Sequence, residues 1–182
     1  MPMRGLFQIC EPIRDAPDAL TYEICGRDRV VSLGLGWPKG TRQRDVLSRS
    51  LWDLLGDGNV ADVYRALIAE IRRTGVGVCF TFRCDDPGTK RMMSMAMMPT
   101  SCGGIRFSSR AIAVEQQEPS LFQRRHLGLP VNVDLCPECG RIKVGNQWQP
   151  ASEALDRLGI FADDLPFRTH QVRCTPCHVA SH

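Results

Sequence analysis

Apolar residues along positions 21–115 recur first with a period of two, then with a helical period, and then with a period of two again. The first stretch, residues 21–34, predicts a β-hairpin. A short helix is predicted to start after Ser50, and a longer amphipathic helix to stop at Gly75. The apolar face of the longer helix consists of Val63, Tyr64, Leu67, Ile68 and Ile71.

Three further strands are predicted after the longer helix. Val78, Phe80 and Phe82 alternate with less apolar positions, and the turn-forming residues 85–88 and 99–104 separate this strand from the next two. The order strand, strand, helix, helix, strand, strand, strand predicts an α+β fold. Its sheet is expected to be mainly antiparallel, with helices covering one face.

The run MMSMAMM at residues 92–98 admits two interpretations. Thioether sulfurs are soft ligands that suit copper(I). In a strand, however, Met93, Met95 and Met97 share one face, and methionine fills irregular gaps in a core. We therefore expect these methionines to pack in the core.

A polar stretch with two prolines, residues 115–131, marks a boundary in the chain. Beyond it, residues 145–146 predict a hairpin turn and residues 151–159 predict a helix. The expected division is an irregular N-terminal arm (1–18), a first domain (19–114), a linker (115–131) and a small C-terminal module (132–182).

Composition limits the function classes. The 182 residues include 23 Lys and Arg against 20 Asp and Glu, and the net charge of +3 is too small to indicate a nucleic-acid-binding protein by itself. The chain has no apolar run long enough for a membrane span and no secretory signal, so we expect a cytoplasmic protein without membrane contact. Nine cysteines in such a protein favour metal binding over a disulfide framework.

Two C-x-x-C motifs, CPEC and CTPC, lie in the expected C-terminal module. Each motif presents two thiolates to one ion, and structural zinc sites use four ligands in a tetrahedron. Gly140, directly after the first motif, permits the left-handed backbone conformation of such a turn. So short a module buries little apolar surface, and a bound ion would stabilise it. The predicted ligands of one structural Zn²⁺ are Cys136, Cys139, Cys174 and Cys177.

Other uses of the cysteines are open at this point. Two independent thioredoxin-like redox pairs would need a βαβ context, which the sequence does not show. His170 or His178, which flank the second motif, could replace one cysteine as a ligand, and the zinc thiolates could respond to oxidation. The candidates for a separate redox switch, or for small buried apolar residues, are Cys25, Cys79, Cys84 and Cys102.

No motif for catalysis is evident. The sequence has no Ser/His/Asp pattern, phosphate-binding loop or dinucleotide fingerprint, and histidine is scarce. A catalytic zinc would keep an open position and use fewer cysteines. We therefore expect that the protein is not an enzyme.

The order of elements, together with RSLWDLL, VYRALIAEIRRTG and the three closing strands, resembles the PAS fold of bacterial sensory proteins. The segments FRCDDPGTKRMMSMAMMP and GGIRFSSR are similar to a subgroup of small bacterial PAS proteins with a C-terminal four-cysteine zinc-binding segment. The resemblance covers residues 19–114 and 132–178. It implies a five-stranded antiparallel sheet with helices on one face, a zinc-ribbon-like module, and a role in sensing or protein interaction.

The resemblance also bears on ligands and partners. The Asn-Cys-Arg-Phe signature of the flavin-binding branch is absent, and residues 1–125 contain no histidine to match the haem ligand of the haem-binding branch. The ligand of a PAS pocket therefore stays unidentified. We expect the signal to pass to a separate partner protein, and by analogy we expect a homodimer through the N-terminal arm and the outer face of the sheet.

Two functions other than sensing or protein interaction are compatible with the sequence. One is a zinc-dependent transcription factor or nucleic-acid-binding regulator, which would suit the CPECG turn. The other is a binder of haem or of another chromophore.

Overall fold

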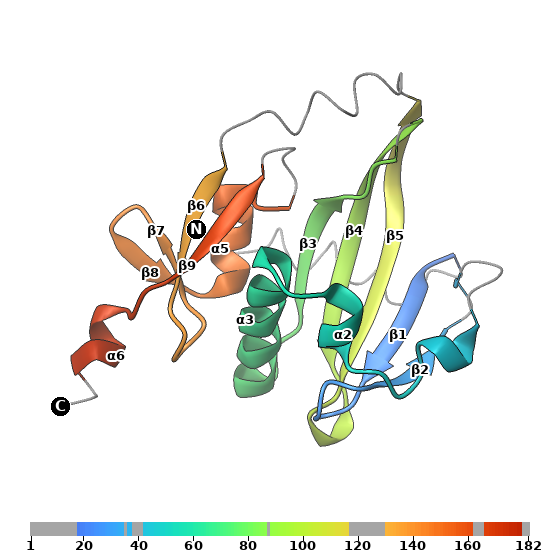
Figure 1. The fold of residues 1–182 in the computed structure, drawn as a ribbon, viewed down its shortest axis with the longest axis horizontal. Helices are drawn as coiled ribbons and strands as arrows, with labels where there is room; N and C mark the ends of the chain where they lie inside the picture. The colour runs from blue at the N-terminus through green and yellow to red at the C-terminus, as the bar shows by residue number, and fades with distance from the viewer. Residues whose placement is uncertain are drawn as a thin grey trace.

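A computed structural model shows how the chain is arranged (Figure 1). It describes residues 18–34, 36–37, 42–86, 88–116, 130–161 and 166–179. The expected N-terminal arm, apart from residue 18, and most of the expected linker lie outside the described residues. In the described part of the chain, no helix is both long enough and apolar enough to cross a membrane.

The first part of the chain forms a five-stranded antiparallel sheet with the strand order β2-β1-β5-β4-β3. Helices α2 and α3 lie on one face of this sheet (Figure 1). The predicted α+β fold and order of elements are thereby confirmed. The elements are β1 (Leu20–Ile24), β2 (Val30–Leu33), η1 (Gln43–Asp45), α2 (Leu51–Leu55), α3 (Asn59–Thr74), β3 (Val78–Arg83), β4 (Thr89–Pro99), η2 (Ser101–Gly103) and β5 (Ile105–Gln116).

Helix α2 begins, and helix α3 ends, where local sequence signals predict. The Ser50 hydroxyl accepts the backbone N–H of Trp52 at 3.3 Å and caps α2. Gly75 follows α3 with a φ of +69°, and its N–H donates to the carbonyl of Ile71. The five apolar residues predicted for the inner face of α3 are all buried.

Methionines of β4 fill the space between the sheet and the helices. Met95 and Met97 are buried, and they lie opposite Phe80 of β3 and Phe107 of β5. The ring of Phe107 stacks on that of Tyr22, with centroids 4.5 Å apart. Met95 and Met97 therefore contribute to the core, as their spacing predicts, whereas Met93 is only half-buried.

The two tyrosines of the chain, Tyr22 and Tyr64, both stack against Phe107 in this core. Burial raises the pKa of Tyr64 to about 12, and burial together with the charge of Tyr64 raises the pKa of Tyr22. The corresponding stability is present below the unfolded pKa of about 10 and is lost as the pH rises toward the folded values. We expect an ultraviolet titration of the folded protein to show little tyrosinate at about pH 10.5, where an unfolded chain is mostly ionised. Ordinary titration near pH 10 in the folded protein would contradict this packing.

The rest of the described chain forms a smaller sheet with the strand order β8-β7-β6-β9. Strands β6 and β9 run parallel, whereas the other pairs are antiparallel. The predicted turn at residues 145–146 joins β7 to β8, and the predicted helix is α5, but β9 and α6 were not predicted. The elements are β6 (Val131–Leu135), β7 (Ile142–Val144), β8 (Gln147–Gln149), α5 (Ala151–Leu158), β9 (Phe167–Gln171) and α6 (Thr175–Val179).

One hydrophobic core joins the two sheets. Val133 of β6 and Leu155 of α5 belong to the same buried cluster as Phe80 of β3. The ring of Phe161 lies 5.3 Å from that of Phe80, and the Phe161 carbonyl accepts the N–H of Arg83 at 2.8 Å. Helix α5 consequently packs beside α3 and β3 (Figure 1).

Polar side chains of α3 also hold the second part of the chain. The Asn59 amide accepts the N–H of Thr169 at 2.9 Å and donates to the carbonyl of Phe167 at 2.7 Å, so it pairs with the edge of β9. Glu70 accepts the backbone N–H and the hydroxyl of Ser152 in the first turn of α5. Helix α3 is therefore fixed between the two sheets.

Candidate metal centre

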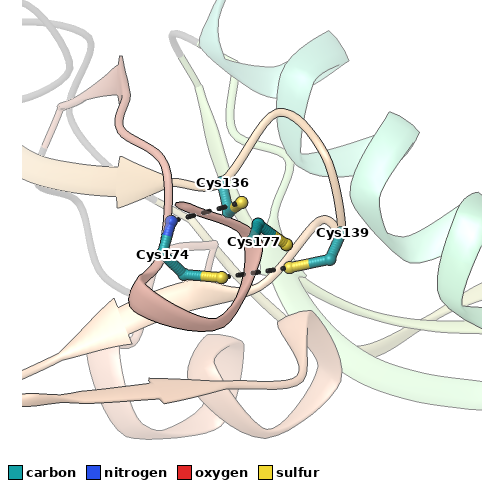
Figure 2. A group of neighbouring side chains, drawn as sticks. All are labelled: Cys136, Cys139, Cys174 and Cys177. Carbon is teal, nitrogen blue, oxygen red and sulfur yellow. Dashed lines mark hydrogen bonds between the residues drawn. The ribbon is translucent and has the colours of Figure 1, made fainter. Parts of the chain in front are cut away.

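The four predicted cysteines come together at one end of the second sheet (Figure 2). Cys136 directly follows β6 and Cys139 lies in the next turn, whereas Cys174 precedes α6 and Cys177 lies within it. Their sulfur atoms all lie within 4.8 Å of one another. Cys136 and Cys174 are buried, Cys177 is half-buried and Cys139 is exposed. The cluster is thus open to solvent on the side of Cys139.

The parallel pairing of β6 with β9 brings the two motifs together. Their register places Leu135 beside Gln171, so both strands end at the same edge of the sheet. The N–H of Val172 then donates to the carbonyl of Leu135 at 2.9 Å. Two residues further, the N–H of Cys174 donates to the sulfur of Cys136 at 3.4 Å.

The turn of the first motif requires a glycine at position 140. The N–H of Gly140 donates to the carbonyl of Cys136 at 2.9 Å, and its φ of +70° lies in the left-handed region that glycine adopts without strain. A Cβ at this position would lie 3.3 Å from the Cα of Ala66 in α3. The backbone conformation was predicted from the sequence, but the close approach to α3 was not.

The spacing of the sulfurs fits a tetrahedral ion. The sulfurs of Cys139 and Cys174 are 3.6 Å apart. Four Zn–S bonds of about 2.3 Å in a tetrahedron would separate the sulfurs by about 3.8 Å. All four cysteines are free thiols, so they do not form disulfides with one another. The cluster is consistent with a metal site such as zinc.

The thiols of the cluster influence one another's ionisation. Burial opposes the ionisation of Cys136, but the backbone N–H groups of Cys174, Cys139 and Glu138 lower its pKa to about 6. Hydrogen bonds with the sulfurs of Cys174 and Cys139 raise the pKa of Cys177 to about 12. A divalent cation that binds four thiolates would therefore release protons from the cluster, including that of Cys177.

Neither histidine near the second motif belongs to the group of potential ligands that the described residues form. His170 lies on β9 beside β6, where its Nδ1 is 3.8 Å from a carboxylate oxygen of Asp134. His178 follows Cys177 in α6, and its side chain is exposed. The donor set that the structure assembles consists of four sulfurs.

A groove of about 460 Å³ borders the cluster, between α3 and the turn of the first motif. Its lining includes Arg65 and Arg73 from α3 and Glu138 and Cys139 from the turn. Sequence reasoning missed this groove, because its existence depends on how closely the turn approaches α3.

The other described cysteines lie outside the cluster. Cys25 is a half-buried free thiol, and Cys84 and Cys102 are exposed free thiols. Cys79 is buried beside Ala96 and is disulfide-bonded. Within the described ranges, none of these cysteines joins a group of three or more potential metal ligands. Their use as a redox switch stays a prediction.

No protein-family model and no curated protein matches the chain. Among solved structures, one match is a crystal structure of a C-terminal domain from Streptococcus mutans. The two chains are 16% identical, the match covers 65% of this chain and 88% of the other, and the TM-score is 0.40. Similarity at this level assigns no function to the chain.

Proposed function

We propose that the protein is a non-catalytic PAS-type module for sensing or protein interaction, that it holds one structural Zn²⁺, and that it passes its signal to a separate partner protein. The position of α3 carries this proposal. One side of α3 packs on the five-stranded sheet, and Ala66 on α3 lies close to the turn of the first cysteine motif, where a Cβ at Gly140 would be 3.3 Å from its Cα. A change in the sheet or in the cluster would therefore act on the same helix.

The donor set supports a structural role for the ion. Catalytic zinc keeps one position for water or substrate and has fewer cysteine ligands, whereas four thiolates complete the tetrahedron. Cys136 and Cys139 would hold the ion from the β6 side, and Cys174 and Cys177 from the α6 side. The ion would stabilise the C-terminal segment by linking its two ends.

The architecture of the first part supports the PAS assignment. A five-stranded antiparallel sheet with helices on one face agrees with the resemblance noted for residues 19–114. A module of this kind would act in the cytoplasm through its contacts with a small molecule or a protein. The net charge of +3 adds no support for binding to nucleic acid.

Binding measurements on the zinc-loaded full chain distinguish sensing from nucleic-acid regulation. We expect weak affinity for duplex DNA that changes little with salt, and we expect a small-molecule screen to find a ligand that raises the melting temperature by mass action. A protein that neutralises six to ten phosphates would instead lose roughly 10³–10⁵ in affinity between about 50 and 200 mM salt. That salt dependence would overturn the sensing proposal in favour of a DNA-binding regulator.

A further inference from the structure

Strand β5 has a free edge over the second half of its length. On one side, residues 110–116 pair with β4. On the other side, β1 pairs with β5 only as far as Leu20 opposite Ser109. In the described part of the chain no strand continues that pairing, and the far half of β5 extends beyond β1 (Figure 1). Among the described residues, the backbone groups along this edge therefore have no strand partner and could pair with another strand.

The free edge carries apolar side chains that are exposed. Ile112 is 49% exposed and Val114 is 56% exposed, and the two alanines at 111 and 113 are exposed as well. Monomeric proteins usually protect such edges with lysine, proline or a covering segment. Residues 110–116 contain neither lysine nor proline. An edge with this composition is suited to pairing with a further strand.

A β-bulge sets which side chains of the edge share a face. Ala111 lies opposite Met93, and Ala113 lies opposite Met92, so Ile112 is an additional residue without a partner on β4. The alternation of side chains between the two faces of the sheet is therefore offset by one residue after the bulge relative to before it.

This shift places Arg110, Ala113 and Glu115 on the same face of the sheet. Their partners on β4 are Ser94, Met92 and Lys90, which are spaced two residues apart. Arg110 and Glu115 therefore lie at equal distances along the ladder on either side of Ala113. Ala111 and Val114 lie between them on the opposite face.

Neither Arg110 nor Glu115 forms an ion pair among the described residues, although Lys90 lies opposite Glu115 on β4. The Nε of Arg110 is buried and has no hydrogen-bond acceptor. The carboxylate of Glu115 is exposed and forms no ion pair among the described residues. An orphaned buried donor is unfavourable, and a carboxylate from a neighbouring strand would satisfy the guanidinium.

We propose that this edge binds a second copy of the chain, by antiparallel pairing of the two β5 edges about a two-fold axis at Ala113. In this register each Arg110 lies opposite the Glu115 of the other copy, so the charge pairing occurs twice. Each Ala111 lies opposite a Val114, and the small Ala113 side chains meet at the axis. With a two-fold axis normal to the sheet, two residues that pair across the interface must lie on the same side of the sheet. Because of the bulge, all three pairs meet this condition.

A second copy is favoured over an unrelated strand because the same short segment carries both members of each charge pair. Arg110 and Glu115 have the spacing that self-pairing requires, and opposite charges across antiparallel strands are stabilising whereas like charges are not. This surface differs from the outer face of the sheet that the PAS resemblance implies. The proposal does not depend on the metal centre, which lies on the second sheet.

Sedimentation velocity of the full chain over a concentration series tests the charge pairing. We expect the wild-type chain to form a dimer, and Arg110→Glu or Glu115→Arg to raise its dissociation constant at least tenfold, because each change places two pairs of like charges across the interface. The double variant Arg110→Glu/Glu115→Arg should restore the constant to within about threefold. A wild-type monomer at all concentrations, or no recovery in the double variant, would overturn the proposal.

A cysteine at the axis tests the register without altering charge. In Ala113→Cys the two new sulfurs would face each other, and mild oxidation should link the copies through a disulfide between the two residues at 113, identified by peptide mass spectrometry. The matched control is Val31→Cys, which places a cysteine at a 54% exposed apolar position on β2. Linkage at position 113 no greater than at position 31 would also overturn the proposal, whatever the oligomeric state.

Discussion

Chelation of the metal is expected to unfold both sheets in one transition. Structural zinc contributes about 10–16 kcal/mol in zinc-finger peptides, whereas a whole domain has a net stability of about 5–15 kcal/mol. Without the ion, the C-terminal segment would lose both this stabilisation and the link between Cys136 and Cys174. Because Val133 and Leu155 of that segment share a core with Phe80 of the first sheet, the effect should spread to β3 and its neighbours.

A cysteine variant tests the same expectation without a chelator. We expect freshly purified wild-type protein to contain about one zinc per chain, and Cys139→Ser to reduce that content at least tenfold and to lower the melting temperature sharply. Three sulfurs cannot complete the tetrahedron that this donor set provides. The matched control is Cys84→Ser, which removes an exposed free thiol outside the cluster and should retain both the zinc and the melting temperature.

Elemental analysis and circular dichroism melts report the two quantities separately. Absence of any metal from fresh wild-type protein would contradict the proposed zinc site. If the metal is present but its removal leaves the circular dichroism melt unchanged, the site is not structural. Loss of the second sheet alone, with hydrogen exchange of β4 unchanged, would show that the two parts are less tightly joined than their contacts indicate.

The first sheet and its helices could be predicted because each element has a strong local signal. Helix α3 combines an apolar face at helical spacing with a glycine at its end, and both features are determined within the helix itself. Strand β9 had no such signal. Its five residues FRTHQ are mostly polar and partly or fully exposed, and they form a strand only because β6 lies alongside and Asn59 satisfies the opposite edge. Tertiary contacts thus override weak local preference there.

The grouping of the four cysteines was predictable for a different reason. Two C-x-x-C turns each arrange a pair of thiols locally, and tetrahedral coordination then requires two such pairs. The route by which the pairs meet was not predictable, because it depends on a parallel strand pairing between segments more than 30 residues apart. The second role of Gly140, its close approach to Ala66, likewise exists only after α3 and the turn have packed.

Truncation of one core residue in the second part should destabilise the whole protein. Leu155 on α5 is only 4% exposed and belongs to the cluster that also contains Phe80. Leu155→Ala is expected to cost about 2–5 kcal/mol, because it removes buried methyl groups and leaves a cavity. Hydrogen exchange should show the same loss of protection for amides in β4 and in β6, and the zinc content should stay at one per chain.

The matched control is Val60→Ala, which shortens a side chain that is 42% exposed on α3 and should change the free energy of unfolding by no more than about 0.5 kcal/mol. A loss of protection confined to β6 in Leu155→Ala would mean that the second sheet opens independently of the first. The four cysteines could then lose their metal without affecting the five-stranded sheet, and α3 would not transmit the loss of the metal to that sheet. Equal losses in both sheets are therefore the result that the proposed coupling through α3 requires.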